Sequence, residues 1–260
     1  MAVQTLSELI KKEKLAEEIY KFSIKAPQIA KIAKPGQFIE IRVADRIVPI
    51  LRRPISIYNI EKDKGIVEFI FQVKGEGTKI LSNKEEGDKI DIIGPLGKGT
   101  FNYENLENIA IIGGGIGVFP LYELAKNASK TSKVNTYLGF RNKNFVVLEK
   151  EFRSVSNNLI ITTDDGTYGE KGFAIEFLRR DIKEKNIQKI FACGPLPMLK
   201  SVQELAEKEN IECEISLEER MACGMGVCLG CTIKVKQEKN FTYLPVCKYG
   251  PVFNSKIVEI

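Results

Sequence analysis

The sequence contains no histidine. This absence removes the commonest general base, and with it any Ser-His-Asp or Cys-His catalytic apparatus. It also excludes zinc sites built from cysteine and histidine, and iron–sulfur clusters of the Rieske type, in which histidine replaces some of the cysteine ligands. The chemistry of this chain therefore has to work without imidazole.

Basic blocks and long apolar runs are missing as well. The 39 Lys and Arg residues are mixed with the 34 Asp and Glu residues, as in residues 11–18, so we expect no nucleic-acid partner. The first 18 residues, MAVQTLSELIKKEKLAEE, carry charges where a signal peptide needs an apolar core. No stretch reaches the length of a membrane-spanning helix. These patterns predict a cytoplasmic protein without membrane contact.

Length and composition predict a soluble globular protein with two or three compact units, because the chain has 260 residues, of which 43% are hydrophobic and 28% charged. It also has six cysteines. A reducing compartment keeps thiols free, so these cysteines indicate metal ligation or redox chemistry in preference to structural disulfides.

The first part of the chain, to about residue 103, has the pattern of an antiparallel barrel or sandwich. Short runs of β-branched and aromatic residues alternate there with Pro/Gly turns, and they read FIEIRV, ISIYNI, IVEFIFQV and KIDII. Residues 11–20 fit a helix or, equally, a charged first strand preceded by an irregular tail.

After residue 103 strands alternate with helical segments, which predicts a doubly wound parallel sheet. The sequence runs IAIIGGGIG, VFPLYELAKNAS, VNTYLGF, LIITTDD, AIEFLRRDIKEK, KIFACGP, LPMLKSVQELAEKEN and IECEIS. A last segment, from about residue 217, holds a cysteine cluster and the short strand pair TIKVK and FTYLPV.

Four cysteines of this last segment have the spacing C-x4-C-x2-C-x15-C, and they are Cys223, Cys228, Cys231 and Cys247. The first three match the plant-type [2Fe–2S] loop. The interleaved Gly224, Gly226 and Gly230 allow the backbone to wrap tightly and to aim N–H groups at sulfur. The alternative is a structural zinc site, although zinc ribbons usually pair two short knuckles. Cys213, in IECEIS, has the character of a small buried hydrophobe without a role.

Two motifs of the barrel region suit phosphate binding. Arg53, at the start of a strand and followed by Pro54, Ile55 and Ser56, can hold a phosphate with two hydrogen bonds. The turn Gly75-Glu76-Gly77-Thr78 precedes a helical segment, TKILSN, whose first amides can hold another phosphate.

Three loops of the later region follow strands and should meet at the carboxyl edge of the sheet, where open α/β sheets bind ligands. Their sequences are Gly113-Gly114-Gly115-Ile116-Gly117, Thr163-Asp164-Asp165-Gly166 and Cys193-Gly194-Pro195. The first differs from the Rossmann fingerprint, which needs glycine where Val118 stands. The alternative for this first loop is a tight strand-to-helix turn without a ligand.

The order of these motifs resembles the ferredoxin-NADP reductase superfamily. It runs RPIS, GEGT, GPLG, GGGIGVFP, CGPLPML and then the cysteine loop. More narrowly, SLEERMACGMGVCLGC and VCKYGPVF resemble the electron-transfer subunit of class 1B dihydroorotate dehydrogenase, and this resemblance covers essentially the whole chain. It implies an FAD-binding β-barrel domain at residues 1–103, an NAD-binding α/β domain at 104–216 and a small [2Fe–2S] domain at 217–260.

The resemblance also implies cofactor ligands but no catalytic residue. FAD would contact Arg53, Pro54, Ile55, Ser56, Ile70, Phe71, Gln72, Gly77 and Thr78. NAD would lie at Gly113, Gly114, Gly115, Gly117, Cys193, Gly194 and Pro195. The cluster would lie on the four clustered cysteines. Many superfamily members stack an aromatic ring on the flavin two residues after the motif arginine, and here that position is Ile55, so an aliphatic contact is expected.

The implied function is electron transfer in pyrimidine biosynthesis. A catalytic partner containing FMN would oxidise dihydroorotate, and electrons would pass through the [2Fe–2S] cluster and FAD to NAD+. The resemblance implies that the two kinds of subunit form a heterotetramer. One alternative is a diaphorase-type subunit of a related hydrogenase or ferredoxin:NAD(P) oxidoreductase. Another, of a different class, is a zinc-stabilised binding protein. The choice between NAD and NADP stays open, because no ribose-binding acid follows Gly139-Phe140-Arg141.

Overall fold

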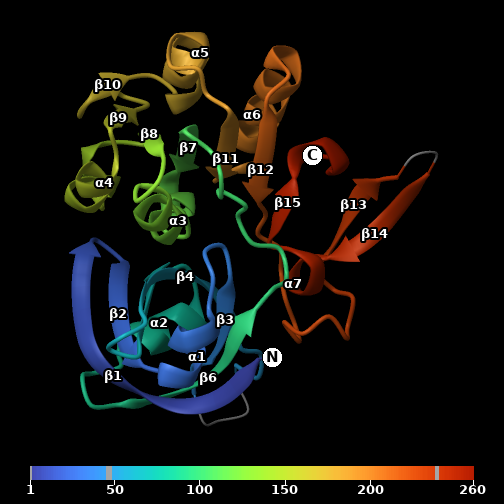
Figure 1. Cartoon of the computed structure of the whole chain (residues 1–260). Helices are drawn as coiled ribbons and strands as arrows, with labels where there is room; N and C mark the ends of the chain where they lie inside the picture. Colours follow the sequence, from blue (N-terminus) through green and yellow to red (C-terminus); the bar gives the residue numbers. More distant parts are fainter. Residues whose placement is uncertain (1, 45–48, 238–239) are drawn as a thin grey trace. The chain divides into compact units, whose positions relative to one another are not determined.

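The structure is a computed structural model that describes residues 2–44, 49–237 and 240–260. The chain forms two compact units, whose elements are labelled in Figure 1. The first unit comprises residues 1–100, 218–232 and 244–251, and the second comprises residues 101–217, 233–243 and 252–260. Among the described residues, no helix is long and apolar enough to cross a membrane.

Six antiparallel strands of the first unit form a closed barrel in the order β1-β2-β5-β4-β3-β6. The barrel closes because β6 pairs with both β1 and β3. Closure leaves no strand edge unpaired, and it confirms the antiparallel barrel predicted from the sequence. The strands are β1 (Val3–Ala16), β2 (Ile19–Lys25), β3 (Phe38–Arg42), β4 (Arg53–Glu61), β5 (Ile66–Gln72) and β6 (Lys89–Leu96).

The charged N-terminal segment is a strand, so the helical alternative for residues 11–20 is wrong. Strand β1 begins at Val3, where an irregular tail was expected, and it pairs with β2 and β6 on its two sides. Leu9 points into the barrel and is fully buried, whereas its neighbours Glu8 and Ile10 are exposed. The alternation of strand side chains therefore places the charges of this segment on the outer surface.

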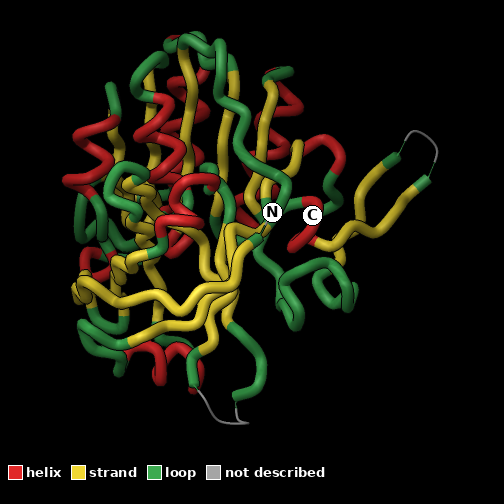
Figure 2. The backbone as a smooth tube through the Cα atoms, turned by 60° about the horizontal axis from the view of Figure 1, so that its bottom comes forward, coloured by secondary structure: helices red, strands yellow, loops and turns green. Residues whose placement is uncertain are grey.

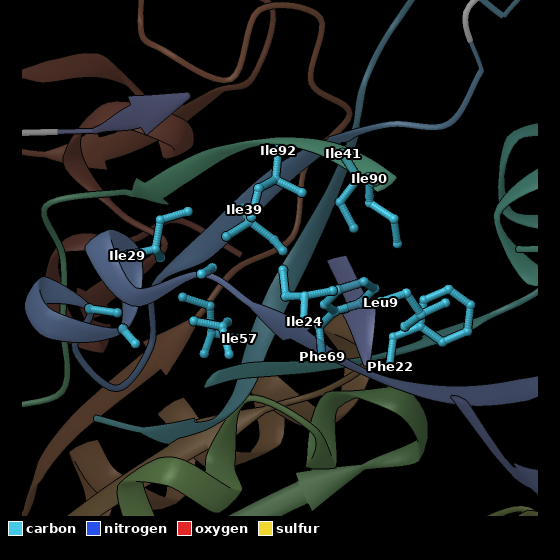
Figure 3. Packing of buried hydrophobic residues seen from close by; sticks show 14 of the residues in the cluster. Leu9, Phe22, Ile24, Ile29, Ile39, Ile41, Ile57, Phe69, Ile90 and Ile92 are labelled. Carbon is cyan, nitrogen blue, oxygen red and sulfur yellow. The ribbon is translucent and has the colours of Figure 1, made fainter. Parts of the chain in front are cut away.

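Aliphatic and aromatic side chains fill the barrel, and Figure 3 shows Leu9, Ile39 and Ile57 among the residues of this core. Phe22 meets Phe71 edge to face, with ring centroids 5.1 Å apart. Two short helices add to the same core, through Ile29 of α1 (Pro27–Ile32) and Leu81 of α2 (Glu76–Ser82).

The second unit contains a seven-stranded sheet with the order β10-β9-β8-β7-β11-β12-β15. All neighbouring pairs are parallel except β12 with β15, which is antiparallel. The chain moves outward from β7 in one direction and then returns to add β11 on its other side. The strands are β7 (Asn108–Gly114), β8 (Lys133–Phe140), β9 (Asn158–Thr163), β10 (Glu170–Lys171), β11 (Lys189–Cys193), β12 (Glu212–Ser216) and β15 (Val252–Asn254).

The change of direction along the sheet determines which face each helix covers. Right-handed crossovers that run in opposite directions place their helices on opposite faces of the sheet. Helix α3 packs with α4, and α5 packs with α6, each pair against strands of the sheet. Figure 2 shows these helices in red beside the yellow strands. The predicted doubly wound sheet is thus confirmed, with α3 (Leu121–Ala128), α4 (Glu149–Val155), α5 (Ala174–Glu184) and α6 (Leu196–Glu209).

The C-terminal segment adds the predicted short strand pair as a two-stranded sheet, β13 (Thr232–Lys236) with β14 (Phe241–Pro245). Helix α7 (Val246–Tyr249) follows directly. Cys213 is buried in β12, and burial raises the pKa of its thiol to about 12. Its thiol therefore stays protonated and packs as a small hydrophobe, as the sequence predicts.

The barrel core yields a matched pair of variants on one strand. Leu9→Ala should lower the free energy of unfolding by about 2–5 kcal/mol, because Leu9 is 0% exposed and its loss leaves a cavity. Leu6→Ala should change it by less than about 0.5 kcal/mol, because Leu6 is 65% exposed. Chemical denaturation of both variants tests this expectation, and equal losses would contradict the inward orientation of Leu9.

Candidate functional site

The cysteine loop between β12 and β13 has no regular secondary structure. Gly224 and Gly226 adopt φ values of +64° and +80°, which side chains rarely tolerate. These turns direct backbone N–H groups at sulfur, as predicted. Met225 N donates to Cys223 Sγ at 3.4 Å, and Gly226 N donates to Cys247 Sγ at 3.0 Å. Such donors stabilise thiolates and cluster sulfur.

The four cysteines come together as two pairs. Cys223 interacts with Cys228, and Cys231 interacts with Cys247, which helix α7 carries. Val246 N donates to the carbonyl of Cys231 at 2.9 Å, so the distant fourth cysteine is fixed to the loop.

This pairing fits a binuclear cluster better than a single metal ion. A four-thiolate zinc site needs all its sulfurs around one point, whereas a [2Fe–2S] cluster on four cysteines takes two thiolates at each iron.

The two pairs differ electrostatically. Burial opposes ionisation of Cys223, but backbone N–H groups, including those of Cys228 and Met225, outweigh it and lower the pKa of this thiol. Burial and the neighbouring Cys231 raise the pKa of Cys247. Cys228 is exposed, whereas Cys231 and Cys247 are buried. The loop thus has one partly exposed pair, in which the Cys223 thiol favours the thiolate form, and one buried pair.

The flavin-type motifs meet at one end of the barrel. Arg53 opens β4, and a β-carbon at Gly77 in α2 would overlap its guanidinium, so the two motifs are in direct contact. The Thr78 hydroxyl accepts from the backbone N of Lys74 at 2.9 Å and donates to the carbonyl of Gly75 at 3.1 Å. The backbone N of Gly75 also donates to this hydroxyl at 3.2 Å, so Thr78 orders the turn.

The other predicted flavin residues fall on β4 and β5. Ile55 is half-buried and packs against the barrel core, while Phe71 is buried within it. Ile70 is buried as well, and the remaining residues of the predicted set are half-buried, namely Pro54, Ser56 and Gln72. The side chains of Ile55 and Phe71 thus have structural roles in the barrel.

The glycine loop after β7 packs directly against the loop after β11. A β-carbon at Gly117 would lie 2.5 Å from the carbonyl oxygen of Cys193, and one at Gly114 would lie 3.0 Å from Pro195. Gly115 has a φ of +55°, and it starts a 3-10 turn, η1 (Gly115–Val118), that leads into α3. Two of the three predicted loops therefore meet at the carboxyl edge, at the point where strand order reverses.

The third loop closes mainly on itself. After β9, the backbone N of Gly166 donates to the carbonyl of Thr163 at 3.1 Å, and Asp165 accepts from the Thr167 hydroxyl at 2.7 Å. Thr167 in turn accepts from the backbone N of Lys143, in the loop after β8. This loop lies at the same carboxyl edge of the sheet, because β9 is parallel to its neighbour β8. The contacts of its side chains, however, stabilise the loop itself.

Sequence reasoning missed one buried acid beside the cysteine loop. Glu40, in β3, is 1% exposed, and burial raises its pKa to about 7 against the opposing effect of Arg52. The only signal in the sequence was the single carboxyl within the strand FIEIRV. This signal is weak, because a strand with one solvent-facing side commonly carries a charged residue on that side.

Comparisons with known proteins assign families to these regions. Residues 218–259 match the iron–sulfur cluster binding domain of dihydroorotate dehydrogenase B. Residues 7–103 match the oxidoreductase FAD-binding domain, and residues 111–204 match the oxidoreductase NAD-binding domain. A relative from Fusobacterium nucleatum, a dihydroorotate dehydrogenase B (NAD(+)) electron transfer subunit, is 39% identical over 95% of each chain. A relative of the same description from Caldanaerobacter subterraneus is 40% identical over 94% of each chain.

The chain belongs to the family of dihydroorotate dehydrogenase B electron transfer subunits. A solved NADH-dependent reduced ferredoxin-NADP oxidoreductase also shares the fold of this family member, with a TM-score of 0.85 and 31% identity over 98% of this chain and 90% of that one. As in the family, the chain combines FAD-binding, NAD-binding and iron–sulfur cluster domains, and it is an oxidoreductase subunit. The matched cysteine domain favours a cluster over zinc.

The pairing of the cysteines generates a prediction. Cys228→Ser should remove the cluster and leave FAD bound, because three thiolates hold a [2Fe–2S] centre poorly and the flavin motifs lie on other elements. Iron and sulfide content and the visible spectrum of the purified variant measure both effects. Cys213→Ala is the matched control, since Cys213 is a buried cysteine of β12 outside the loop. Stoichiometric iron and sulfide in the Cys228 variant would show that the ligand set is wrong.

Proposed function

We propose that this chain is the electron-transfer subunit of an NAD-dependent dihydroorotate dehydrogenase of pyrimidine biosynthesis. It receives electrons from the FMN of a catalytic subunit and passes them through a [2Fe–2S] cluster and FAD to NAD+. The observation that carries the proposal is the paired four-cysteine loop, in a segment that matches the cluster domain of this enzyme class and on a chain with FAD- and NAD-binding domains.

The proposed division of labour assigns FAD to residues 1–103, NAD to residues 104–216 and the cluster to residues 217–260. When bound, FAD exchanges single electrons with a cluster and a hydride with a nicotinamide. Arg53 holds a flavin phosphate beside the Gly77 turn. The amides of Gly113–Gly117 hold the pyrophosphate of NAD, beside Cys193 and the turn that follows it.

The four cysteines hold the cluster, and the backbone amides of the loop hydrogen-bond to their sulfurs. Three large apolar side chains of the same loop are exposed, namely Met225, Val227 and Leu229. Exposed apolar groups around a redox centre suit a protein partner, and this supports docking of the FMN-containing catalytic subunit there, in a heterotetramer. Cysteines without disulfide bonds also fit the reducing cytoplasm.

A second candidate is the corresponding subunit of a ferredoxin:NAD(P) oxidoreductase. The likeness to the solved NADH-dependent reduced ferredoxin-NADP oxidoreductase favours it, at a TM-score of 0.85. Co-purification separates the two candidates, because the first predicts capture of a subunit that oxidises dihydroorotate and the second predicts a ferredoxin-linked flavoprotein.

The role of Arg53 can be tested by substitution. Arg53→Ala should weaken flavin retention on the order of tenfold or more, because a charge-assisted phosphate contact of roughly 1.5–3 kcal/mol is lost. Arg52→Ala is the matched control, since Arg52 already pairs with Asp91 at 2.6 Å. Flavin content after dialysis distinguishes the two variants. Full flavin occupancy in the Arg53 variant would count against a phosphate contact by Arg53.

The proposed division of labour predicts half-reactions. The chain alone should reduce artificial acceptors with NADH but should leave dihydroorotate unchanged, because removing a carbon-bound proton needs a positioned base, which the proposal assigns to the partner. Adding the catalytic subunit should create transfer from dihydroorotate to NAD+. Cys228→Ser should abolish this coupled transfer and keep the NADH-dependent activity. Turnover of dihydroorotate by the chain alone would overturn the assignment.

A further inference from the structure

The hairpin of β13 and β14, drawn in red in Figure 1, presents an exposed aromatic face. Phe241 and Tyr243 alternate along β14, so their side chains lie on one face of the two-stranded sheet, and they are 54% and 64% exposed. Lys234 of β13 lies on this face too, because its ammonium is 3.9 Å from the centroid of the Phe241 ring. Lys236, two residues further along β13, is exposed on the same face. We call these four residues the hairpin face.

The other side of the hairpin is covered by the protein itself. Val235 lies between Lys234 and Lys236 in β13, and it is 2% exposed. It forms an antiparallel bridge with Val258, and the backbone N of Glu259 donates to the carbonyl of Lys234 at 3.2 Å. The apolar side of β13 is therefore turned toward the protein, and the hairpin face is turned toward solvent.

Contacts within the protein order the hairpin face. The ammonium of Lys234 pairs with the carboxylate of Glu259 at 2.9 Å while it lies over the ring of Phe241. A cation is attracted to the face of an aromatic ring, so this lysine also orients the phenylalanine. Side chains that are ordered in advance lose less conformational entropy when a partner binds. Exposed aromatic residues supply much of the binding energy of protein interfaces. The hairpin face therefore has the properties of a preformed surface for a protein partner.

The charge of this region indicates the chemistry of that partner. Residues 232–248 contain four lysines and one glutamate. Lys234 is neutralised by Glu259, whereas Lys236 adds an exposed positive charge beside the aromatic rings. Complementary charges steer two proteins together and fix the orientation in which they dock. The hairpin face thus fits a protein surface that combines carboxylates with apolar groups.

The hairpin begins and ends beside two of the clustered cysteines. Strand β13 starts directly after Cys231, and β14 ends two residues before Cys247. An extended chain spans at most about 3.6 Å per residue, so the Cα atoms of Tyr243 and Cys247 lie within about 14 Å of each other. A partner that comes close enough to exchange electrons with a cluster on these cysteines therefore also comes within reach of the hairpin face.

We propose that the hairpin face is a docking surface for an acidic surface of the FMN-containing catalytic subunit. The inference rests on the proposed function, which supplies that subunit as the partner. In this contact the rings of Phe241 and Tyr243 bury apolar area, and Lys236 meets a carboxylate of the partner. The hairpin face is a contact in addition to the exposed apolar side chains of the cysteine loop, and it orients the partner through its aromatic rings and its charge.

Two substitutions test the two parts of this surface. Tyr243→Ala should weaken binding of the catalytic subunit on the order of tenfold or more, because it removes a large ring from the interface. Lys236→Glu should weaken binding on the order of tenfold at low salt and less at high salt, because salt screens the repulsion between the new carboxylate and those of the partner. Lys236→Arg keeps the charge and should bind like the parent. Leu6→Ala, on the outer surface of the barrel, is the control for loss of an exposed apolar side chain.

The measurement is the apparent Kd of the purified holo-chain for the purified catalytic subunit, obtained by titrating the transfer from dihydroorotate to NAD+ at low and at high salt. Flavin, iron and sulfide content and the NADH-dependent reduction of an artificial acceptor are measured on each variant, and they should equal the parent values. These readouts separate a docking defect from a folding defect.

Weaker binding by both Tyr243→Ala and Lys236→Glu, with parent affinity in Lys236→Arg and Leu6→Ala, supports the proposal. Parent affinity in either of the first two variants overturns it, and so does an equal loss in the Leu6 control. If Tyr243→Ala loses its cofactors, the two Lys236 variants decide by the same criterion. A parent chain that does not bind a dihydroorotate-oxidising subunit would instead overturn the proposed function.

Discussion

Closure of the barrel is the constraint on which the first unit depends. Strand β6 pairs with β1 and β3 at the same time, so the register of every strand is fixed by two neighbours. That register brings the start of β4, with Arg53, against the Gly77 turn, and it aims Glu40 of β3 outward at the cysteine loop. A slip by one residue would exchange the faces and put Glu40 into the core.

Two candidate sites also depend on glycine residues at which another segment of the chain approaches the backbone closely. Gly224 leaves room for the carboxyl of Glu40, and Gly117 leaves room for the carbonyl of Cys193. In both places a methyl group would separate two segments that are far apart in the sequence. The candidate cluster site and the candidate nucleotide site thus depend on the same property, namely that glycine has no side chain to hold neighbouring backbone away.

Histidine-free chemistry is consistent with what these sites supply. Backbone amides and thiolates make up the cysteine loop, and an arginine and glycine turns make up the candidate phosphate sites. None of these groups has to carry a proton between reactants. Protein groups in an electron-transfer subunit bind and orient cofactors and set their potentials, and the proposed function assigns no acid–base step to this chain.

The sequence by itself determined the barrel, the parallel sheet and the cysteine loop, because period-two alternation, glycine turns and cysteine spacing are local patterns. Only the tertiary structure decided that residues 11–16 belong to a strand and not to a helix, since the charges of β1 fit either form until β2 and β6 pair with it. It also decided that Cys231 pairs with Cys247 and that Glu40 lies buried against Gly224. These contacts join residues that are far apart in the chain. Local sequence patterns contain no information about which distant segment will pack against a given residue.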